Sequence, residues 1–300
     1  MHESIVIREV IMKKVIVAML ASCVLFVSLA SGACAAPAEW PKKLVFGIIP
    51  TDSQANITER YSNLVQYLEK ALGVPIEVKV ATDYAGVITG MQFKHVDFAY
   101  FGPKSYVEAA KRANAEAFCL EVLEDGTKGY HGIIITKKNS GLTSMADLKG
   151  KVWAFTDPNS TSGTLVPMVY FFKALNIRPE NYFSRVIYSG SHEASMLAVK
   201  SGKVDGASTN DLDMERGNGK QWNADKDFNI IWTSDLIPGS PIAYRKDLPE
   251  SLKKALRDAY LAYNDQVGLK MLKLKGYAPA TDKTYDPIRD QMEVKKQLDK

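Results

Sequence analysis

A short polar stretch, Asp157–Gly163, holds the side chains whose types and spacing are best suited to chemistry. An apolar run at 151–155 precedes it and another at 165–175 follows it, so the pattern predicts a strand, a turn and a helix. Asn, Ser and Thr cap helix N-termini, where free backbone N–H groups and the positive end of the helix dipole attract anions. Hydroxyl groups add hydrogen-bond donors without adding charge, which suits a compact oxyanion. A capped helix without any ligand is the competing interpretation.

The elements expected around this stretch occur twice, in the same order. The expected strands are 44–50, 76–80 and 95–102 in the first copy and 152–155, 185–188 and 203–208 in the second. Three matched pairs are 108 positions apart: Pro50 with Pro158, Tyr84 with His192, and Asp97 with Asp205. Repeated strand–helix–strand units predict an α/β fold of two similar lobes. We expect the two aspartates to be structural and to accept hydrogen bonds from loop N–H groups.

The repeat predicts where a ligand would bind. In open α/β sheets, ligands bind at the carboxyl ends of strands, in the loops that lead into helices. Each lobe offers two such loops. Two lobes that face each other would place Tyr84, Ser160, Thr161 and His192 around one cleft.

Two turn-rich segments, near 129 and 235, predict chain crossings that form a hinge of paired strands. We expect lobe 1 to comprise residues 37–129 and 235–300, and lobe 2 to comprise residues 130–234. The segment after Pro249 predicts helices that pack back on lobe 1.

Residues 1–36 predict a secretory signal peptide. A basic segment at 12–14 precedes an apolar run at 15–30, and the A-x-A motif at 33–35 marks a cleavage site. The apolar run is short for a membrane span, which needs about 20 residues. We therefore expect a periplasmic protein; a lipid anchor at Cys23 is the less favoured alternative.

The composition indicates an ordinary globular protein, with 46% hydrophobic and 24% charged residues. The net charge of +4 is mild and no basic stripe occurs, so we expect no nucleic-acid partner. Beyond the signal peptide only Cys119 remains, which predicts a buried thiol and no internal disulfide.

An enzyme is the weakest interpretation. A hydrolase or phosphatase of the serine type would need Ser160, His192 and an aspartate, but the G-x-S-x-G motif does not occur. The histidines His95, His131 and His192 lack the spacing of metal ligands. We therefore expect neither catalysis, nor a metal, nor a cofactor.

Several motifs together resemble those of periplasmic phosphonate-binding proteins of the PhnD type, the substrate receptors of ABC importers for phosphonate, phosphite or phosphate. They occur in the family's order: Asp83–Gly86, Gly129-Tyr130, Asp157–Gly163, His192-Glu193 and Ile237–Gly239. The resemblance covers the chain beyond the signal peptide and implies a two-lobe periplasmic binding protein, type II-like, with its ligand between the lobes. It implies that Ser160 and Thr161 hold the PO3 group. Further donors would be Tyr84, Tyr130 and His192, with Ser162 as a secondary candidate.

The chain departs from this family at two positions. Members that bind aminoethylphosphonate place carboxylates against the ligand's ammonium, whereas this chain has Leu212 and Ser240 at those positions. Asp211 or Asp213 would replace the first by a shift of one residue, so Asp211 and Ser240 are secondary ligand candidates. Because a buried unpaired ammonium is costly, we expect methylphosphonate, phosphite or phosphate rather than aminoethylphosphonate.

The resemblance also implies partners and a mechanism. The expected partner is an ABC transporter permease, which would recognise the closed form of a monomeric receptor. The ligand would dock on lobe 2, and closure of the lobes would exclude water and strengthen each hydrogen bond. A periplasmic receptor that reports its ligand to a membrane signalling protein is the alternative.

Overall fold

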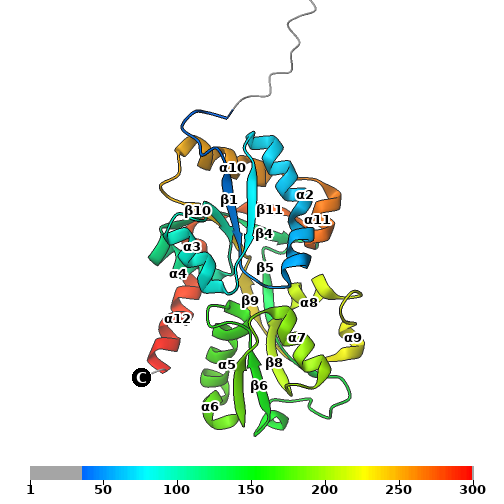
Figure 1. Cartoon of the computed structure of the whole chain (residues 1–300). Coiled ribbons are helices and arrows are strands. Elements are labelled where there is room, and N and C mark those ends of the chain that lie inside the picture. The colour runs from blue at the N-terminus through cyan, green and yellow to red at the C-terminus, as the bar shows by residue number, and fades with distance from the viewer. Residues whose placement is uncertain (1–35, 299–300) are drawn as a thin grey trace, which may run out of the picture. The chain divides into compact units, whose positions relative to one another are not determined.

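The structure is a computed structural model that describes residues 36–298. The predicted signal peptide, with Cys23 and Cys34, lies outside the described residues. From Ala38 onward the chain forms one compact unit that contains two sheets, each covered by helices (Figure 1). Within 36–298, no helix combines the length and the apolar character that crossing a membrane requires.

The first sheet has six strands in the order β11-β4-β10-β3-β1-β2. β1 is parallel to β2 and β3, whereas β10 is antiparallel to β3 and β4, and β11 is antiparallel to β4. The strands are β1 (Leu44–Ile48), β2 (Ile76–Val80), β3 (Phe98–Tyr100), β4 (Ala115–Leu123), β10 (Pro241–Arg245) and β11 (Leu274–Pro279). The helices around it are α2 (Gln54–Leu72), α3 (Tyr84–Gln92), α4 (Pro103–Ala113), α10 (Glu250–Ala262) and α11 (Gln266–Leu272).

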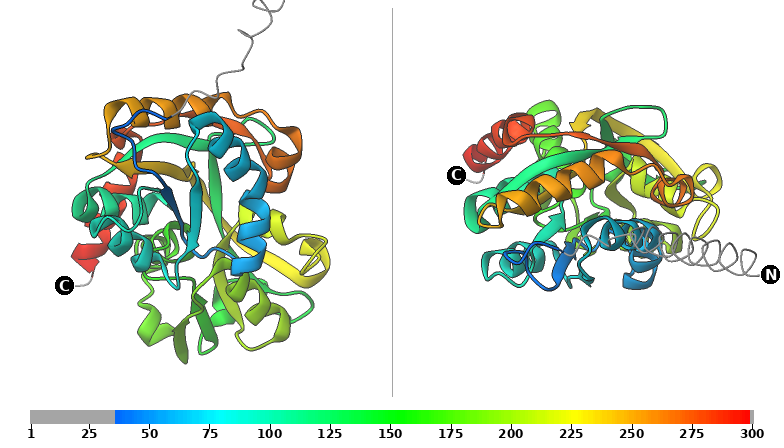
Figure 2. Two further views of the ribbon diagram at one scale, coloured as in Figure 1. Left: turned by 45° about the horizontal axis from the view of Figure 1, so that its top comes forward. Right: turned by 90° about the horizontal axis from the view of Figure 1, so that it is seen from above.

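Alternate residues of β1 point to opposite faces of this sheet. The ring of Phe46 stacks on Phe98 and meets Tyr61 of α2 edge-on, so α2 packs on this face. Tyr260 of α10 meets Phe98 edge-on from the same side. Gly47 points the other way, where Val87 of α3 and Val96 leave no room for a side chain. The helices α2 (blue) and α10 (orange) therefore lie side by side, as Figure 2 shows.

The second sheet has five strands in the order β7-β6-β8-β5-β9. β6 is parallel to β7 and β8, and β5 is antiparallel to β8 and β9. The strands are β5 (Gly129–Lys137), β6 (Val152–Phe155), β7 (Arg185–Tyr188), β8 (Gly206–Asn210) and β9 (Phe228–Pro238). Its helices are the 3-10 turn η1 (Ala146–Leu148), the π-helical turn η2 (Thr161–Leu165), α5 (Val166–Leu175), α6 (Pro179–Tyr182), α7 (His192–Ser201), α8 (Asp211–Gly217) and α9 (Ala224–Asp227).

Two buried clusters hold the second lobe together, one on each face of its sheet. Trp153 packs against Phe155 and Phe171 of α5 on one face. Ala154, the next residue of β6, packs with Met196 of α7 on the other. Residues 153–155 are therefore buried on both faces, as expected of a parallel strand between helices.

The predicted repeat is confirmed. β1 lies between two parallel neighbours in the first sheet, as β6 does in the second. Asp97 Oδ2 accepts a hydrogen bond from Val45 N at 2.8 Å, and Asp205 Oδ2 accepts one from Val152 N at 2.8 Å. In each lobe a carboxylate that precedes one strand thus ties down the start of its neighbour. Both aspartates are structural, as expected, but they accept from N–H groups of strands rather than of loops.

The chain passes between the two sheets twice, at 124–128 and at 239–240. These crossings are joined by hydrogen bonds. Gly239 N donates to Lys128 O at 3.0 Å, and Glu121 N donates to Ser240 O at 3.1 Å. Gly129 and Pro238, at the ends of β5 and β9, pair directly.

The C-terminal segment differs in part from the prediction. Helices α10 and α11 pack on the first lobe against α2, as expected, but β11 then adds a strand at the edge of the first sheet. The sequence of β11 alternates only weakly, so its pairing with β4 defines it as a strand. The last helix, α12 (Asp286–Leu298), follows the 3-10 turn η3 (Asp282–Tyr285) and contacts α4 and α5, hence both lobes (Figure 1).

Candidate ligand-binding site

A small cavity of about 20 Å³ lies where the two lobes meet. Strand ends of both sheets and the helices that follow them line it: Ile49, Thr51, Tyr84, Tyr100, Gly102, Tyr130, Ser160, Thr161, His192, Asn210, Leu212, Asp213 and Ser240. A cavity needs about 10–15 Å³ to hold one water molecule, so this space suits one compact group. The structure thus brings together Tyr84, Tyr130, Ser160, Thr161 and His192, and it adds the secondary candidate Ser240.

The other two secondary candidates lie outside this wall. Ser162 is 1% exposed, and its Oγ accepts a hydrogen bond from Asn210 Nδ2 at 3.4 Å. Asp211 Oδ1 accepts the backbone N–H of His131 at 2.9 Å. Both side chains therefore support elements of lobe 2, and neither is among the lining residues.

Ser160 caps the helix that begins at the cavity, but the first turn is wider than an α-helical turn. Ser160 Oγ accepts from Gly163 N at 3.0 Å, and Ser160 O accepts from Leu165 N, five residues on, at 3.1 Å. The Gly163 carbonyl instead accepts from Thr156 N at 3.0 Å and from Ser208 Oγ at 2.7 Å. A Cβ at position 163 would collide with Thr156, so glycine is required there. Single π-helical turns occur frequently at functional sites.

Thr161 connects the two lobes at the cavity wall. Its Oγ1 accepts the backbone N–H of Lys104, at the N-terminus of α4 in lobe 1, at 2.8 Å. Because the oxygen is an acceptor in that contact, the hydroxyl hydrogen can be donated to Tyr130 or to a ligand. The side chain is 2% exposed, so this donor is shielded from bulk water.

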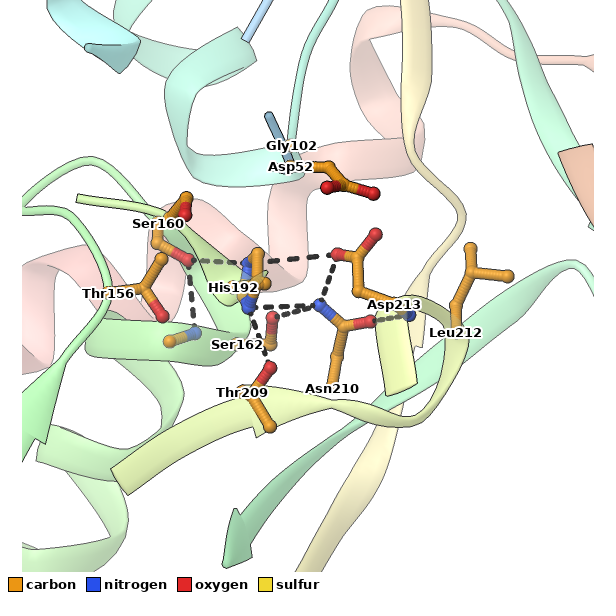
Figure 3. Close-up of polar contacts among 12 residues, drawn as sticks. Asp52, Gly102, Thr156, Ser160, Ser162, His192, Thr209, Asn210, Leu212 and Asp213 are labelled. Carbon is orange, nitrogen blue, oxygen red and sulfur yellow. Dashed lines mark hydrogen bonds and ion pairs between the residues drawn. The ribbon is translucent and has the colours of Figure 1, made fainter. Parts of the chain in front are cut away.

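His192 presents a neutral imidazole to the cavity. Asp213 N donates to Asn210 Oδ1 at 2.7 Å, which fixes the orientation of the Asn210 amide. His192 Nδ1 lies 3.0 Å from Thr209 Oγ1 and 3.3 Å from Asn210 Nδ2, and these contacts hold the ring in place. Burial lowers the pKa of His192, so the ring is neutral at neutral pH, and its Nε2 lies 3.4 Å from Ser160 Oγ (Figure 3).

Two tyrosine hydroxyls complete the set of donors. Tyr84, the first residue of α3, is 1% exposed, and its hydroxyl has no hydrogen-bond partner among the described residues. Buried polar groups are nearly always hydrogen-bonded, so an unpaired hydroxyl beside a cavity indicates an acceptor that a ligand would bring. Tyr130 of β5 lies near Ser162 and Thr161, which partly offset the rise that burial causes in the pKa of its hydroxyl. Burial raises the pKa of both tyrosines, so both remain protonated at neutral pH.

Asp213 supplies a carboxylate to the cavity wall. Its Oδ2 accepts from Asn210 Nδ2 at 2.9 Å, and its Oδ1 accepts from Arg216 Nη1 at 3.3 Å. Arg216 belongs to α8 of lobe 2 but reaches into lobe 1, where its Nη2 lies 2.8 Å from Glu121 Oε1. All three side chains are buried, so this charge network joins the lobes directly behind the cavity.

The sequence indicated some of these residues and not others. Leu212 and Ser240 line the cavity, as their positions implied. Asn210 was missed because the preceding strand was expected to end at 208, whereas β8 runs to Asn210 and places it at the carboxyl end of a strand. Arg216 and Glu121 gave no sequence signal, since their pairing depends on how the two lobes meet.

A larger groove, of about 390 Å³, lies between α4 and α12. Its lining includes Lys111, Arg289 and Lys296 together with Glu108 and Glu293, and it is a surface of mixed charge rather than a set of convergent donors. The small cavity is therefore the better candidate. In the described part of the chain, no group of three His, Cys, Asp or Glu side chains is placed to hold a metal ion.

The two lobes, the paired crossings and the donor-lined cavity between them define a periplasmic binding protein. A solved binding-protein component of an ABC phosphonate transporter from Pseudomonas aeruginosa superposes with a TM-score of 0.82, at 34% identity, over 86% of this chain and 87% of that one. The chain belongs to the family described as "ABC transporter, phosphonate, periplasmic substrate-binding protein", which it matches over residues 46–285. The predicted family and two-lobe fold are thus confirmed, and the family consists of transport receptors, not enzymes.

Two relatives show the range of named ligands. The "Phosphonates-binding periplasmic protein" of Escherichia coli (strain K12) is 39% identical over 259 residues, which is 84% of this chain and 76% of the relative. The "Phosphate-import protein PhnD" of Mycolicibacterium smegmatis is 28% identical over 85% of this chain and 86% of the relative. The family therefore includes receptors named for phosphonate and for phosphate.

Proposed function

We propose that this receptor captures a small phosphorus oxyanion in the cavity between its lobes and delivers it to an ABC transporter permease. The observation that carries the proposal is the hydroxyl of Tyr84, which has no partner among the described residues and belongs to a residue that lines the cavity together with other hydroxyls and an imidazole. Ser160, Thr161, Tyr130 and His192 supply the other donors. Hydrogen bonds from such donors to an anionic oxygen are stronger than bonds between neutral groups.

The shape and chemistry of the cavity favour methylphosphonate, phosphite or phosphate over aminoethylphosphonate. The cavity of about 20 Å³ is small, which favours a compact group over one that carries an aminoethyl arm. Leu212 and Ser240 offer no charge to an ammonium. Asp213 also lines the cavity, but its carboxylate lies 4.0 Å from His192 Nε2, so it would meet the oxyanion itself rather than an ammonium at the end of an arm.

Capture would occur by closure of the lobes around the ligand. The crossings at 124–128 and 239–240 are short and mutually hydrogen-bonded, so they suit a hinge. The expected lobe bounds, 37–129 and 235–300 for lobe 1 and 130–234 for lobe 2, lie within a few residues of these crossings, since β5 begins at Gly129 and β9 ends at Pro238. The ligand would be bound first by Ser160 and Thr161. We further propose that residues 1–36 direct secretion to the periplasm and that the receptor acts as a monomer without nucleic acid.

Calorimetric titration of the ligand-stripped protein tests the proposal. The protein should bind at least one of methylphosphonate, phosphite and phosphate tightly, and aminoethylphosphonate weakly. Thr161→Ala and His192→Ala should each weaken binding on the order of 10- to 100-fold, the effect of losing a hydrogen bond to a charged group. Thr58→Ala removes an exposed hydroxyl of α2 and serves as the control. Unchanged affinity in both cavity variants would refute the site, and no binding of any phosphorus oxyanion would refute the ligand class.

A further inference from the structure

The carboxylate of Asp213 is an unexpected group in the wall of an anion site. It is 8% exposed and shares the cavity with the donors Ser160 and His192. An ionised carboxylate only accepts hydrogen bonds, and a ligand oxygen without a proton also only accepts. The two would repel each other at contact distance. An anionic ligand fits beside Asp213 only if it brings a hydrogen to that contact.

The hydrogen-bond partners of Asp213 leave acceptor capacity on the cavity side. A carboxylate has about four lone-pair sites. Two bonds from protein groups are present, from Asn210 Nδ2 at 2.9 Å and from Arg216 Nη1 at 3.3 Å. His192 Nε2 is 4.0 Å from Oδ2, too far for a direct hydrogen bond (Figure 3).

The neighbouring charges leave the Asp213 carboxylate able to accept a further hydrogen bond. Arg216 is divided between two acids, and its contact with Glu121 at 2.8 Å is shorter than its contact with Asp213 at 3.3 Å. Among the lining residues that the structure describes, none is Lys or Arg. The charge of Asp213 is therefore incompletely offset on the side that faces the ligand.

We propose that Asp213 accepts a hydrogen bond from a protonated oxygen of the ligand and thereby selects phosphorus oxyanions against sulfate and sulfonates. This proposal rests on the proposed function, since it concerns the same cavity. Phosphate, phosphite and phosphonates carry a P–O–H group in their monoanionic forms, whereas sulfate and sulfonates are fully ionised near neutral pH and carry no hydrogen on oxygen. The fixed donors bind the unprotonated oxygens of the ligand, and Asp213 accepts a hydrogen bond from the protonated one.

Methylphosphonate and methanesulfonate make the sharpest comparison. At a mildly acidic pH both are monoanions of nearly the same shape, and they differ in whether one oxygen carries a hydrogen. The intact protein should bind methylphosphonate more tightly, on the order of 100-fold, because one ligand gains a charge-assisted bond and the other meets a repelling carboxylate. This measurement needs no variant.

Asp213→Asn places an amide at the same position, and an amide can donate to a sulfonate oxygen. The preference for methylphosphonate should shrink at least 10-fold in this variant, while Glu215→Gln, which removes an exposed carboxylate of the same helix, should retain it. Thermal unfolding of each variant shows whether it is folded. Equal binding of the two ligands by the intact protein, or an unchanged preference in folded Asp213→Asn, would overturn the inference while leaving phosphorus-oxyanion capture in place. Failure of the intact protein to bind any phosphorus oxyanion would overturn both.

Discussion

Replacing Tyr84 by phenylalanine should separate ligand binding from stability. The substitution removes one hydroxyl and leaves the ring, which is 1% exposed, in place. In the ligand-free protein this hydroxyl has no partner among the described residues, and an unsatisfied buried hydroxyl costs about 1–3 kcal/mol. Its removal should therefore stabilise the free protein by about 1 kcal/mol, a rise in Tm of about 2–4 °C for a chain of this size.

The same substitution should weaken binding. If the hydroxyl donates to an anionic oxygen, that bond is worth about 1.5–3 kcal/mol, so the affinity should fall on the order of 10- to 100-fold. Titration calorimetry with methylphosphonate and with phosphate measures the affinity, and thermal unfolding without and with ligand measures both effects. The variant should be more stable than the intact protein without ligand and less stabilised by ligand.

Tyr260→Phe is the matched control. Its hydroxyl is also buried without a partner in the described part of the chain, but it lies in the core of lobe 1, away from the cavity. This variant should gain stability in the same way and keep its affinity. If Tyr84→Phe lowers the Tm of the free protein and leaves the affinity unchanged, the hydroxyl does not face a ligand, and the assignment of the cavity loses its main support.

Three further expectations concern the elements around the cavity. Gly163→Ala should destabilise the protein by about 1–3 kcal/mol in urea titrations, because its Cβ would collide with Thr156; an unchanged midpoint would contradict the described π-helical turn. Arg216→Met should cost about 3–5 kcal/mol in the same assay, since it leaves the buried Glu121 without its cation, and a smaller loss than an exposed Arg→Met change would refute the network. Burial and Asp52 raise the pKa of Glu193 to about 7, so the native state holds a proton that the unfolded state releases and stability falls as pH rises from 5 to 7. In Glu193→Gln the loss of unfolding free energy between pH 5 and 7 should be smaller by about 1 kcal/mol, a figure reduced because the side chain is partly exposed. Identical pH profiles of the variant and the intact protein would contradict this expectation.

The polar stretch at 157–163 shows how far the sequence led. Its residue types predicted a capped helix beside an anion site, and the structure places Ser160 as the cap and Ser160 and Thr161 in the cavity wall. The widened turn was not predictable, because it results from the Gly163 carbonyl bonding to Thr156 and Ser208, which lie on other strands. Local pattern thus located the stretch, and tertiary hydrogen bonds set its geometry.

The two aspartates of the repeat and the pair Arg216–Glu121 show the same division. Asp97 and Asp205 were predictable as structural residues because a spacing of 108 positions linked them in one chain. The partner of Arg216 lies 95 positions away with no repeated spacing, and their 2.8 Å contact arises only where α8 of one lobe meets β4 of the other. Contacts within a repeated unit can be inferred from sequence, whereas contacts between lobes depend on their docking.

Among the described residues that line the cavity none is Lys or Arg, which is consistent with a receptor that must release its ligand. Hydrogen bonds from hydroxyls and a neutral imidazole require close contact and gain strength when water is excluded. The attraction of a Lys or Arg falls only as the inverse of distance, so it would persist as the lobes separate. Tyr84 comes from lobe 1, whereas Ser160, Thr161 and His192 come from lobe 2, and Lys104 N of lobe 1 bonds to Thr161 Oγ1, so separation of the lobes would break up the donor set. We infer that affinity in this receptor depends on closure itself, so that a permease which opens the lobes lowers the affinity without having to compete for a charge.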